Sequence, residues 1–506
     1  MKRAALTVGL FLISLYLNMA AGINRGDEAW FLQVMRRVHE GEVLYRDVFY
    51  GAGPLTVAFT APLISLIGVE ILAVKAMVAA GYTAALLFGM RILERMGAGP
   101  GACMLFLGAN LLLAPPAPHA PYQSLANAFL MAAFDATTAA LGASDAQARR
   151  RLLAWAGAAA GLSFAAKQNI GGYAFLAILG SFLIRRGEER PPLRRLWIES
   201  SSLGLAFLGT LALTFLPVWL SGGGPKFMDY GALNKTTYLR LSGIPYTEGL
   251  AGILRSLQAL SPHSTLEQWL WALRSFSFLL PFLAGFFWIG GFLVPPSSGR
   301  APWIASGLFA AAAFLGIFPR ADYAHLIYAV PALLTVMISG WSAWSIRPWK
   351  IVLERGIGAL LILGLIVALM IPPLRLLQGR LTISSLPHFG GVLIAPALQA
   401  QIMEESARLR ERAPEPSVFL LFPTAGFYYL QTGLRNPTPF DIPTATSFGR
   451  AGQEETMQAI REGRIRWVCY WRWEWNLRPA RIEAFVEQEM EPGENLGLCT
   501  LYRARR

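Results

Sequence analysis

Two adjacent carboxylates, Asp27 and Glu28, follow the first apolar run of this 506-residue chain. Charged side chains beside a bilayer are costly unless they are solvated, paired or used, so the pair is a candidate catalytic site. Neighbours on a helix point about 100° apart, so only one of them can face a given substrate. We expect one carboxylate to act on the substrate while the other caps, pairs or binds elsewhere. The alternative is an ordinary helix start, which acidic residues stabilise.

Three basic residues are candidates for binding a phosphate group: Arg46, Lys167 and Arg320. Arginine matches the geometry of a phosphate with two parallel hydrogen bonds, and lysine supplies a compact positive charge. Lys167 ends an apolar stretch, so it has an alternative role in which its side chain only extends to the bilayer surface.

A second polar cluster contains Asp322 and His325, which lie three residues apart and share a face if the segment is helical. The alternative is that Asp322 caps the helix and bonds to His325. His119 is a further candidate because it lies in a turn between apolar runs. The residues that we expect to line a substrate cavity are Asp47, Tyr50, His119, Tyr122, Asp322 and His325.

The composition indicates a polytopic α-helical membrane protein, with 54% hydrophobic and 15% charged residues. Apolar runs of about 17–22 residues are long enough to cross a bilayer as helices. The first run lacks a clear cleavage site and is interpreted as a retained anchor. We predict about eleven membrane helices, near residues 4–22, 70–93, 100–116, 122–142, 152–167, 170–185, 198–220, 274–294, 302–318, 324–344 and 353–373.

Groups of Lys and Arg fall at alternate ends of these helices, which predicts that those ends are cytoplasmic. The groups are at residues 2–3, 91–95, 149–151, 185–195, 300 and 347–350. The N-terminus is then inside an inner (plasma) membrane, and loops 23–53 and 221–270 are outside with everything after about residue 375. These arginines explain most of the net charge of +13. Nucleic-acid binding is not expected, because no basic patch belongs to a soluble domain.

The segment 379–506 differs in composition from the membrane domain expected at 1–378. Strand patterns at 417–422, 466–471 and 496–502 alternate with helical patterns at 453–462 and 481–490, which predicts a small extracytoplasmic α/β domain. Cys469 and Cys499 fall in two of these strands, so a disulfide can form in an oxidising compartment if the geometry allows it. Four tryptophans between 467 and 475 indicate packing or head-group contact, with sugar stacking as the sharper alternative.

The first loop continues through Tyr45-Arg46-Asp47 to Gly53-Pro54-Leu55. Together with the Asp-Glu pair, this pattern resembles the GT-C superfamily of membrane glycosyltransferases. It is most similar to the branch of protein O-mannosyltransferases and lipid A aminoarabinose transferases. The stretch from Gly157 to Lys167 resembles the family's glycine-rich helix that ends in lysine, and Leu430–Thr438 resembles an Arg-Asn-Pro-Thr turn of its periplasmic domain.

The resemblance implies a polyprenyl-phosphate-linked sugar as donor, an active cavity at the outer face and an inverting reaction. It aligns Asp27 with the family's catalytic acid in the first loop. The family often has another acid near the start of the fourth helix, where this chain has His119-Ala-Pro-Tyr122. This departure argues against a divalent metal, and we predict no metal ligand.

A sugar on a lipid phosphate already has a good leaving group, so transfer needs a base for the acceptor hydroxyl and positive charge for the phosphate. We therefore predict a glycosyltransferase with Asp27 as base and a lipid, glycan or protein acceptor outside the cytoplasm. Two alternatives are a lipid-sugar transporter, for which paired halves and mid-membrane charges are expected, and a non-catalytic subunit of a membrane complex.

Overall fold

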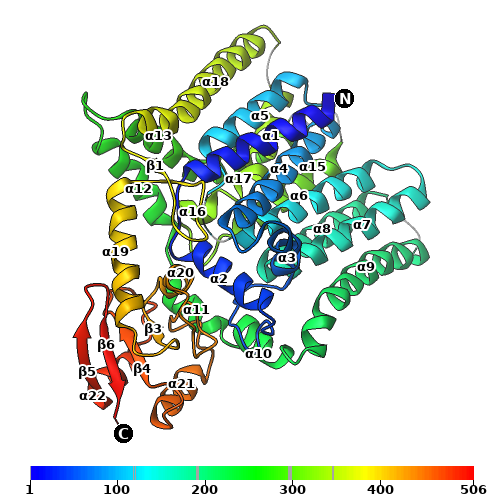
Figure 1. Cartoon of the computed structure of the whole chain (residues 1–506). Helices are drawn as coiled ribbons and strands as arrows, with labels where there is room; N and C mark the ends of the chain where they lie inside the picture. The colour runs from blue at the N-terminus through cyan, green and yellow to red at the C-terminus, as the bar shows by residue number, and fades with distance from the viewer. Residues whose placement is uncertain are drawn as a thin grey trace.

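The computed structural model describes residues 2–117, 119, 121–189, 193–293, 299–344 and 347–505. A helical part is followed by a smaller tail of strands and helices (Figure 1). The helices of the first part are α1 (Lys2–Ala20), α2 (Asp27–His39), α3 (Leu55–Ile67), α4 (Ile71–Arg95), α5 (Pro100–Leu113), α6 (Pro121–Gly142), α7 (Ala146–Ala166), α8 (Gln168–Glu189), α9 (Leu193–Leu220), α10 (Gly224–Met228), η1 (Asp229–Leu233), α11 (Lys235–Ser242), α12 (Tyr246–Gln258), α13 (Leu266–Ser275), η2 (Phe276–Leu279), α14 (Leu280–Gly290), α15 (Arg300–Leu315), α16 (Tyr323–Leu326), α17 (Val330–Trp344) and α18 (Arg347–Leu377).

Every one of the apolar ranges predicted from the sequence overlaps one of these helices. Within the described residues, six stretches are long and apolar enough to cross a membrane: Arg3–Ala20, Ile71–Arg95, Pro121–Gly142, Trp197–Leu220, Leu266–Gly290 and Glu354–Leu377. Five shorter apolar helices accompany them. One of these, α3, was not predicted. The chain is therefore a helical protein with several candidate membrane helices, and the number of crossings stays a prediction.

The centre of the helical part is formed by α4, α6, α7 and α8, which pack side by side with α9 and α15 around them (Figure 1). The α7–α9 contact depends on small residues. A Cβ added to Gly157 would lie 2.3 Å from the carbonyl oxygen of Leu203, so only glycine lets the two helices approach this closely. Between α6 and α15, the rings of Phe134 and Phe309 stack with centroids 4.8 Å apart.

Ion pairs gather at the ends of these helices that lie far from the tail. Asp135 of α6 binds Arg91 and Arg95 of α4 at 3.0 and 2.8 Å, and Arg149 of α7 binds Glu199 of α9 at 2.9 Å. Several of the predicted basic groups thus meet at one end of the bundle. The side chains of the groups at 185–190 and 347–350 lie outside the described residues.

The tail contains a four-stranded sheet in the order β3-β4-β6-β5, with β3 and β4 parallel and the other pairs antiparallel. Two of the three predicted strands are confirmed as β3 and β4, and the third overlaps the start of β6; β5 was not predicted. The elements are β1 (Thr382–Ile383), β2 (Leu393–Ile394), α19 (Pro396–Arg412), β3 (Phe419–Leu421), α20 (Ala425–Thr432), α21 (Gly452–Arg461), β4 (Trp467–Tyr470), α22 (Ala480–Glu489), β5 (Met490–Asn495) and β6 (Thr500–Ala504).

A disulfide joins Cys469 of β4 to Cys499 just before β6, with the two Cα atoms 5.6 Å apart. The pairing that the sequence left open is therefore made in the structure. Because Cys469 lies directly opposite Leu501 in the β4–β6 ladder, the bridge fastens two neighbouring strands near the point where they pair.

The tail packs on α2 of the first loop through buried polar contacts. Arg37 binds the Asp441 carboxylate at 3.0 Å and donates to the carbonyl oxygen of Thr438 at 2.9 Å. Asn436, in the Arg-Asn-Pro-Thr turn, donates to the same Asp441 at 2.9 Å. The turn therefore holds the carboxylate that fixes the tail to α2.

Candidate active site

The N-terminal end of α2 is built by the Asn24 side chain. Its Oδ1 accepts hydrogen bonds from the backbone N–H groups of Gly26 and Asp27, at 2.8 and 3.1 Å, and its Nδ2 lies 2.5 Å from Nδ1 of His119. Asp27 is the first residue of the helix, where the helix dipole favours a negative charge. The loop is thus fixed in place while the Asp27 carboxylate is left out of the capping bonds.

Asp27 and Glu28 have opposite surroundings. Glu28 is fully buried and pairs with Lys75 of α4, whose Nζ lies 3.0 Å from its carboxylate. Lys75 also donates to the carbonyl oxygens of Asn18 and Gly22, each at 3.0 Å. This closed network leaves the Glu28 carboxylate no open side for a substrate, so Glu28 is the member of the pair that binds elsewhere. In the described part of the chain, the partly exposed Asp27 carboxylate has no hydrogen-bond or ion-pair partner.

Three tyrosines surround the Asp27 carboxylate closely enough for its charge to act on their phenol groups: Tyr122, Tyr238 and Tyr328. They come from the start of α6, from α11 and from the turn after α16. Tyr328 donates to the carbonyl oxygen of His119 at 2.5 Å and so holds the turn at His119 against the segment that follows α16. Asp27 therefore lies near polar and aromatic side chains from segments far apart in the sequence, and this group of residues is called the recess below.

Lys167 reaches the same recess from the break between α7 and α8. Its backbone is extended and ends α7, and its Nζ lies 6.0 Å from the ring centre of Tyr122 and 3.3 Å from the carbonyl oxygen of Gly316. The first loop packs directly on this helix end. A Cβ on Gly53 would lie 2.0 Å from the carbonyl oxygen of Ala165, so the approach requires glycine. The predicted position of Lys167 at a helix end is confirmed.

Arg320 and Asp322 lie in the turn between α15 and α16. Arg320 binds Asp322 at 3.3 Å. The charges of Arg320 and Asp27 both act on the phenol group of Tyr238. The guanidinium of Arg320 lies 5.8 Å from the ring centre of Trp475, a half-exposed side chain of the tail. Arg320 therefore connects the recess to the tail.

The Asp322–His325 pair holds this turn in shape. Asp322 caps α16 by accepting from the His325 backbone N–H at 3.0 Å, and Nδ1 of His325 lies 2.6 Å from the same carboxylate oxygen. Although burial raises the pKa of Asp322, the hydrogen bonds from His325 keep that pKa below its ordinary value. Asp322 therefore caps α16 and bonds to His325, which is the alternative considered from the sequence.

His325 lies in a positive environment. Burial lowers the pKa of His325, against the opposing effect of the hydrogen bond to Asp322. The charges of Lys167 and Arg320 lower the pKa of His325 further. A neutral imidazole near pH 7 donates its Nδ1–H to Asp322. The positive charge near His325 therefore comes from Lys167 and Arg320.

Arg46 and Asp47 were expected at the phosphate site and the substrate cavity, and the structure places them at the other end of α2 from Asp27. They pair with each other at 2.8 Å on an exposed part of the loop. The carbonyl oxygen of Asp47 accepts from Arg37 at 2.9 Å, and Arg37 lies in the last turn of α2. Along a helix, that turn is about 15 Å from Asp27. Arg46 therefore lies beside the last turn of α2, away from Lys167 and Arg320.

Tyr50 lies behind the recess and not in its lining. It is fully buried, and its ring packs 6.4 Å from that of Tyr122 and 5.6 Å from that of Trp30. Its contribution is to support Tyr122. His119 likewise acts through its contacts with Asn24 and Tyr328.

Tyr238 and Tyr328 were not singled out as site residues, because no local motif marks them, and Trp475 was noted only within the group of four tryptophans. Only packing of α11, α16 and the tail brings them to Asp27 and Arg320. Lys75 did carry a signal, since a lysine within an apolar run demands a partner.

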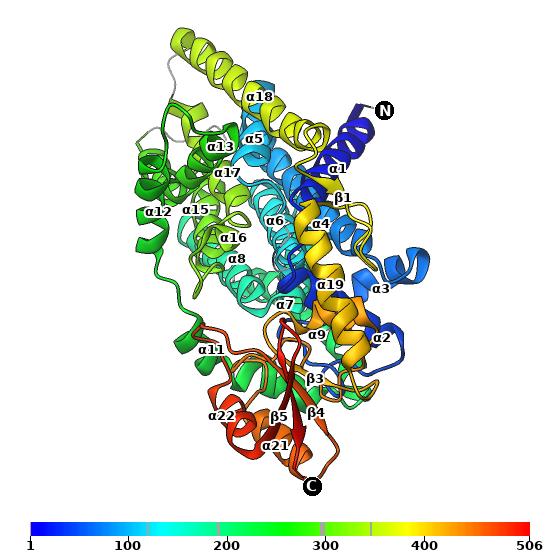
Figure 2. The same cartoon turned by 60° about the vertical axis from the view of Figure 1, so that its left-hand side comes forward.

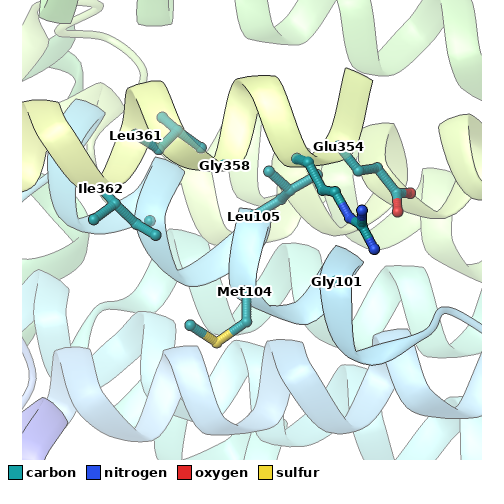
Figure 3. A pocket seen from close by; sticks show the side chains of 9 residues that line it. Gly101, Met104, Leu105, Glu354, Gly358, Leu361 and Ile362 are labelled. Carbon is teal, nitrogen blue, oxygen red and sulfur yellow. The ribbon is translucent and has the colours of Figure 1, made fainter. Parts of the chain in front are cut away.

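An apolar groove lies elsewhere, between α5 and α18 (Figure 3). It has a volume of about 230 Å³ and is lined by Gly101, Met104, Leu105, Gly108, Glu354, Arg355, Gly358, Leu361 and Ile362. It contains none of the predicted site residues. Among the described residues, no group of three or more His, Cys, Asp or Glu side chains is arranged to hold a metal ion.

Comparison with known proteins gives a match at the level of the fold. No family model and no curated protein matches the chain. ArnT from Cupriavidus metallidurans bound to undecaprenyl phosphate superposes with a TM-score of 0.57 at 13% identity, covering 99% of this chain and 98% of that one. This chain has the GT-C fold. The apo form of the same ArnT gives 0.54 at 13% identity, over 99% and 97% of the two chains.

The GT-C fold implied by the sequence motifs is thus found over nearly the whole length of the chain. A mycobacterial arabinofuranosyltransferase, AftD, matches less well, with a TM-score of 0.47 at 14% identity over 98% of this chain and 39% of the other. The coverage of ArnT includes the tail as well as the helical part, so the two are combined in both proteins.

Proposed function

We propose that this protein is a glycosyltransferase that moves a sugar from a polyprenyl-phosphate donor to an acceptor outside the cytoplasm. The observation that carries the proposal is the Asp27 carboxylate, which lacks a partner within the described residues. Tyr122 lies near both Asp27 and Lys167, and Tyr238 lies near both Asp27 and Arg320. The fold shared with ArnT, whose structure holds undecaprenyl phosphate, supports the donor class.

In the proposed reaction, Asp27 accepts the proton of the acceptor hydroxyl as that oxygen attacks C1 of the sugar. The bond between C1 and the phosphate oxygen breaks, and its electron pair leaves with the polyprenyl phosphate. Lys167 and Arg320 balance the charge that develops on this leaving group. Attack opposite the departing phosphate gives an inverted anomeric centre.

The surrounding residues have positioning roles in this scheme. Asp322 orients Arg320 and is itself oriented by His325. Tyr122 lies between Lys167 and Asp27, so its ring is placed to contact the sugar. A base that must stay ionised benefits from the positive end of α2, at which Asp27 lies.

The proposed orientation places the N-terminus and the basic helix ends in the cytoplasm, and the recess and the tail outside it. The protein is then a multi-pass protein of the inner (plasma) membrane, with a membrane domain at 1–378 and an extracytoplasmic domain at 379–506. The arginine bias of the helix ends supports this orientation, and the Cys469–Cys499 disulfide fits an oxidising compartment.

Transfer from labelled polyprenyl-phosphate sugars to membrane lipids, glycans and proteins tests this function. Wild-type protein should transfer label from at least one donor, and Asp27→Asn should not. Asp47→Asn is the matched control, because Asp47 is a first-loop carboxylate outside the recess. Equal transfer by wild type and Asp27→Asn would contradict the assignment.

A further inference from the structure

A second cavity lies between α11 and the tail, next to the recess but separate from it. It has a volume of about 520 Å³ and is lined by residues of α11, α21 and α22 and of the loops before the last two. These three helices lie near one another in Figure 2. Four arginines line it: Arg240 of α11, Arg450 before α21, Arg478 before α22 and Arg481 within α22.

Three of these arginines are held in place by carboxylates. Nε of Arg450 lies 2.6 Å from Asp229, and Nε of Arg478 lies 2.7 Å from Glu483. Arg481 uses Nη2 to bind Glu454 at 2.9 Å. A guanidinium has five N–H donors, so each one keeps donors for a ligand after this contact.

Arg240 makes no ion pair within the described residues, so the lining carries four cations against three partner carboxylates. Two helix N-termini add to the positive potential, since α21 begins at Gly452 and α22 begins at Ala480, and both ends border the cavity. Positive side chains in a rigid frame, with space between them, are the features of a site for phosphate or carboxylate groups.

The cavity is adjacent to the candidate active site through two segments. On α11, Tyr238 senses Asp27 and Arg320, while Thr237 and Arg240 line the cavity. In the tail, Trp475 lies against Arg320 and Arg478 lines the cavity three residues later. The helix α11 and the segment from Trp475 to Arg478 therefore connect the arginine-lined cavity to the residues around Asp27.

We propose that this arginine-lined cavity binds a phosphate or carboxylate group of the acceptor, so that a hydroxyl of the same molecule reaches Asp27. The inference rests on the proposed function and names the acceptor class, which is anionic. A lipid head group and a phosphorylated glycan carry the same chemistry, and the experiment separates them.

The test measures binding to the full-length protein in nanodiscs of neutral phosphatidylcholine. The soluble probe is radiolabelled glucose 6-phosphate, with unlabelled inorganic phosphate as competitor and glucose as the neutral comparison. The lipid probe is phosphatidic acid, presented in the nanodisc and compared with phosphatidylcholine alone. Binding of either anionic probe should weaken as salt is raised, because the attraction is between charges.

The double variant Arg240→Gln/Arg481→Gln should lower the affinity for the anionic probe about tenfold, the effect of losing charge-assisted hydrogen bonds. Arg466→Gln is the matched control. Its side chain is 68% exposed and bound to Glu415, much as that of Arg481 is 69% exposed and bound to Glu454. The control should keep wild-type affinity. This result would show that the loss in the double variant does not follow from removing any exposed arginine of the tail.

Unchanged affinity in the double variant, or equal binding of glucose and glucose 6-phosphate, would overturn the proposal. Preference for the soluble probe assigns the anion to a glycan, and preference for phosphatidic acid assigns it to a lipid. Sugar transfer is measured separately, in wild type and in Asp27→Asn. The two proposals can therefore fail separately. The cavity proposal is judged by the binding of the anionic probes, and the transferase proposal is judged by sugar transfer.

Discussion

Two neighbouring carboxylates at the start of α2 have different energetic roles. Glu28 is stabilised by Lys75 within a buried network, whereas Asp27 is partly exposed and has no side-chain partner among the described residues. A carboxylate bound by a lysine and held away from water cannot accept a proton from a substrate without first losing that contact. The division of labour follows from the turn of about 100° between neighbours on a helix.

Removing Lys75 should leave Glu28 as an uncompensated buried charge. We expect Lys75→Met to lower the free energy of unfolding by about 3–5 kcal/mol, which thermal unfolding in detergent would detect as a lower Tm. Lys75→Met/Glu28→Gln should recover part of that loss. Arg255→Ala, which breaks an exposed pair with Glu248, should change little. No loss of stability in Lys75→Met would show that the buried pair does not fix the first loop.

The two cations of the recess should affect the donor more than the acceptor. Lys167→Gln and Arg320→Gln are expected to raise the Kd for polyprenyl phosphate by about tenfold each, since each removes a charged donor from the phosphate. Arg46→Gln should leave this Kd unchanged, because Arg46 lies with Asp47 at the other end of α2. Weakened binding in Arg46→Gln alone would return Arg46 to the phosphate site.

At the scale of elements, α2 links the recess to the tail. Arg37 and Asp441 meet at 3.0 Å, with 7% and 0% of their side chains exposed, so the contact is nearly closed to water. A buried pair of this kind costs more to break than it contributes when intact. It therefore fixes the register between the first loop and the tail.

Arg37→Ala should loosen the tail without unfolding the helical part. Hydrogen exchange of the backbone amides in 419–441 should become faster, while that of α6 and α7 should not change. Lys226→Gln is the matched control, because Lys226 binds Glu455 of the tail through an exposed pair. Unchanged exchange in Arg37→Ala would mean that apolar contacts alone hold the tail.

The helices were predictable because long apolar runs and basic ends are local signals. The helix α3 was missed because it has only 13 residues and contains Pro62, and α19 and α20 were not predicted. Asp27, Lys167 and Arg320 were singled out from residue type and position at helix ends. Arg46 was grouped with them although it lies with Asp47 at the other end of α2, because closeness in a loop sequence does not show which end of a helix the loop returns to. Tyr238 depends wholly on tertiary packing.

At the scale of the whole molecule, the arginine-lined cavity lies between α11 of the helical part and α21 and α22 of the tail, which are near one another in Figure 2. The helix α2, which begins at Asp27, also packs on the tail. The paired arginines of α4 and α7 lie at the far end of the bundle. A single membrane orientation therefore puts the candidate chemistry on one side and the topogenic charges on the other.

Reporter fusions test this orientation. A phosphatase that is active only outside the cytoplasm should be inactive when fused after Arg95 or Arg151 and active when fused after Arg505. A fluorescent protein that matures in the cytoplasm should give the opposite pattern. Phosphatase activity after Arg95 would reverse the proposed topology and place the recess in the cytoplasm.

The central claim is that Asp27 acts as the base in sugar transfer, and comparing donor binding with turnover in Asp27→Asn tests it most directly. The substitution keeps the size of the side chain and removes its basicity, so kcat should fall by about 10²–10⁴ while the Kd for the donor stays near that of wild type. Asp47→Asn should match wild type in both. A kcat for Asp27→Asn within a few-fold of wild type, with donor binding intact, would contradict the role of Asp27 as base.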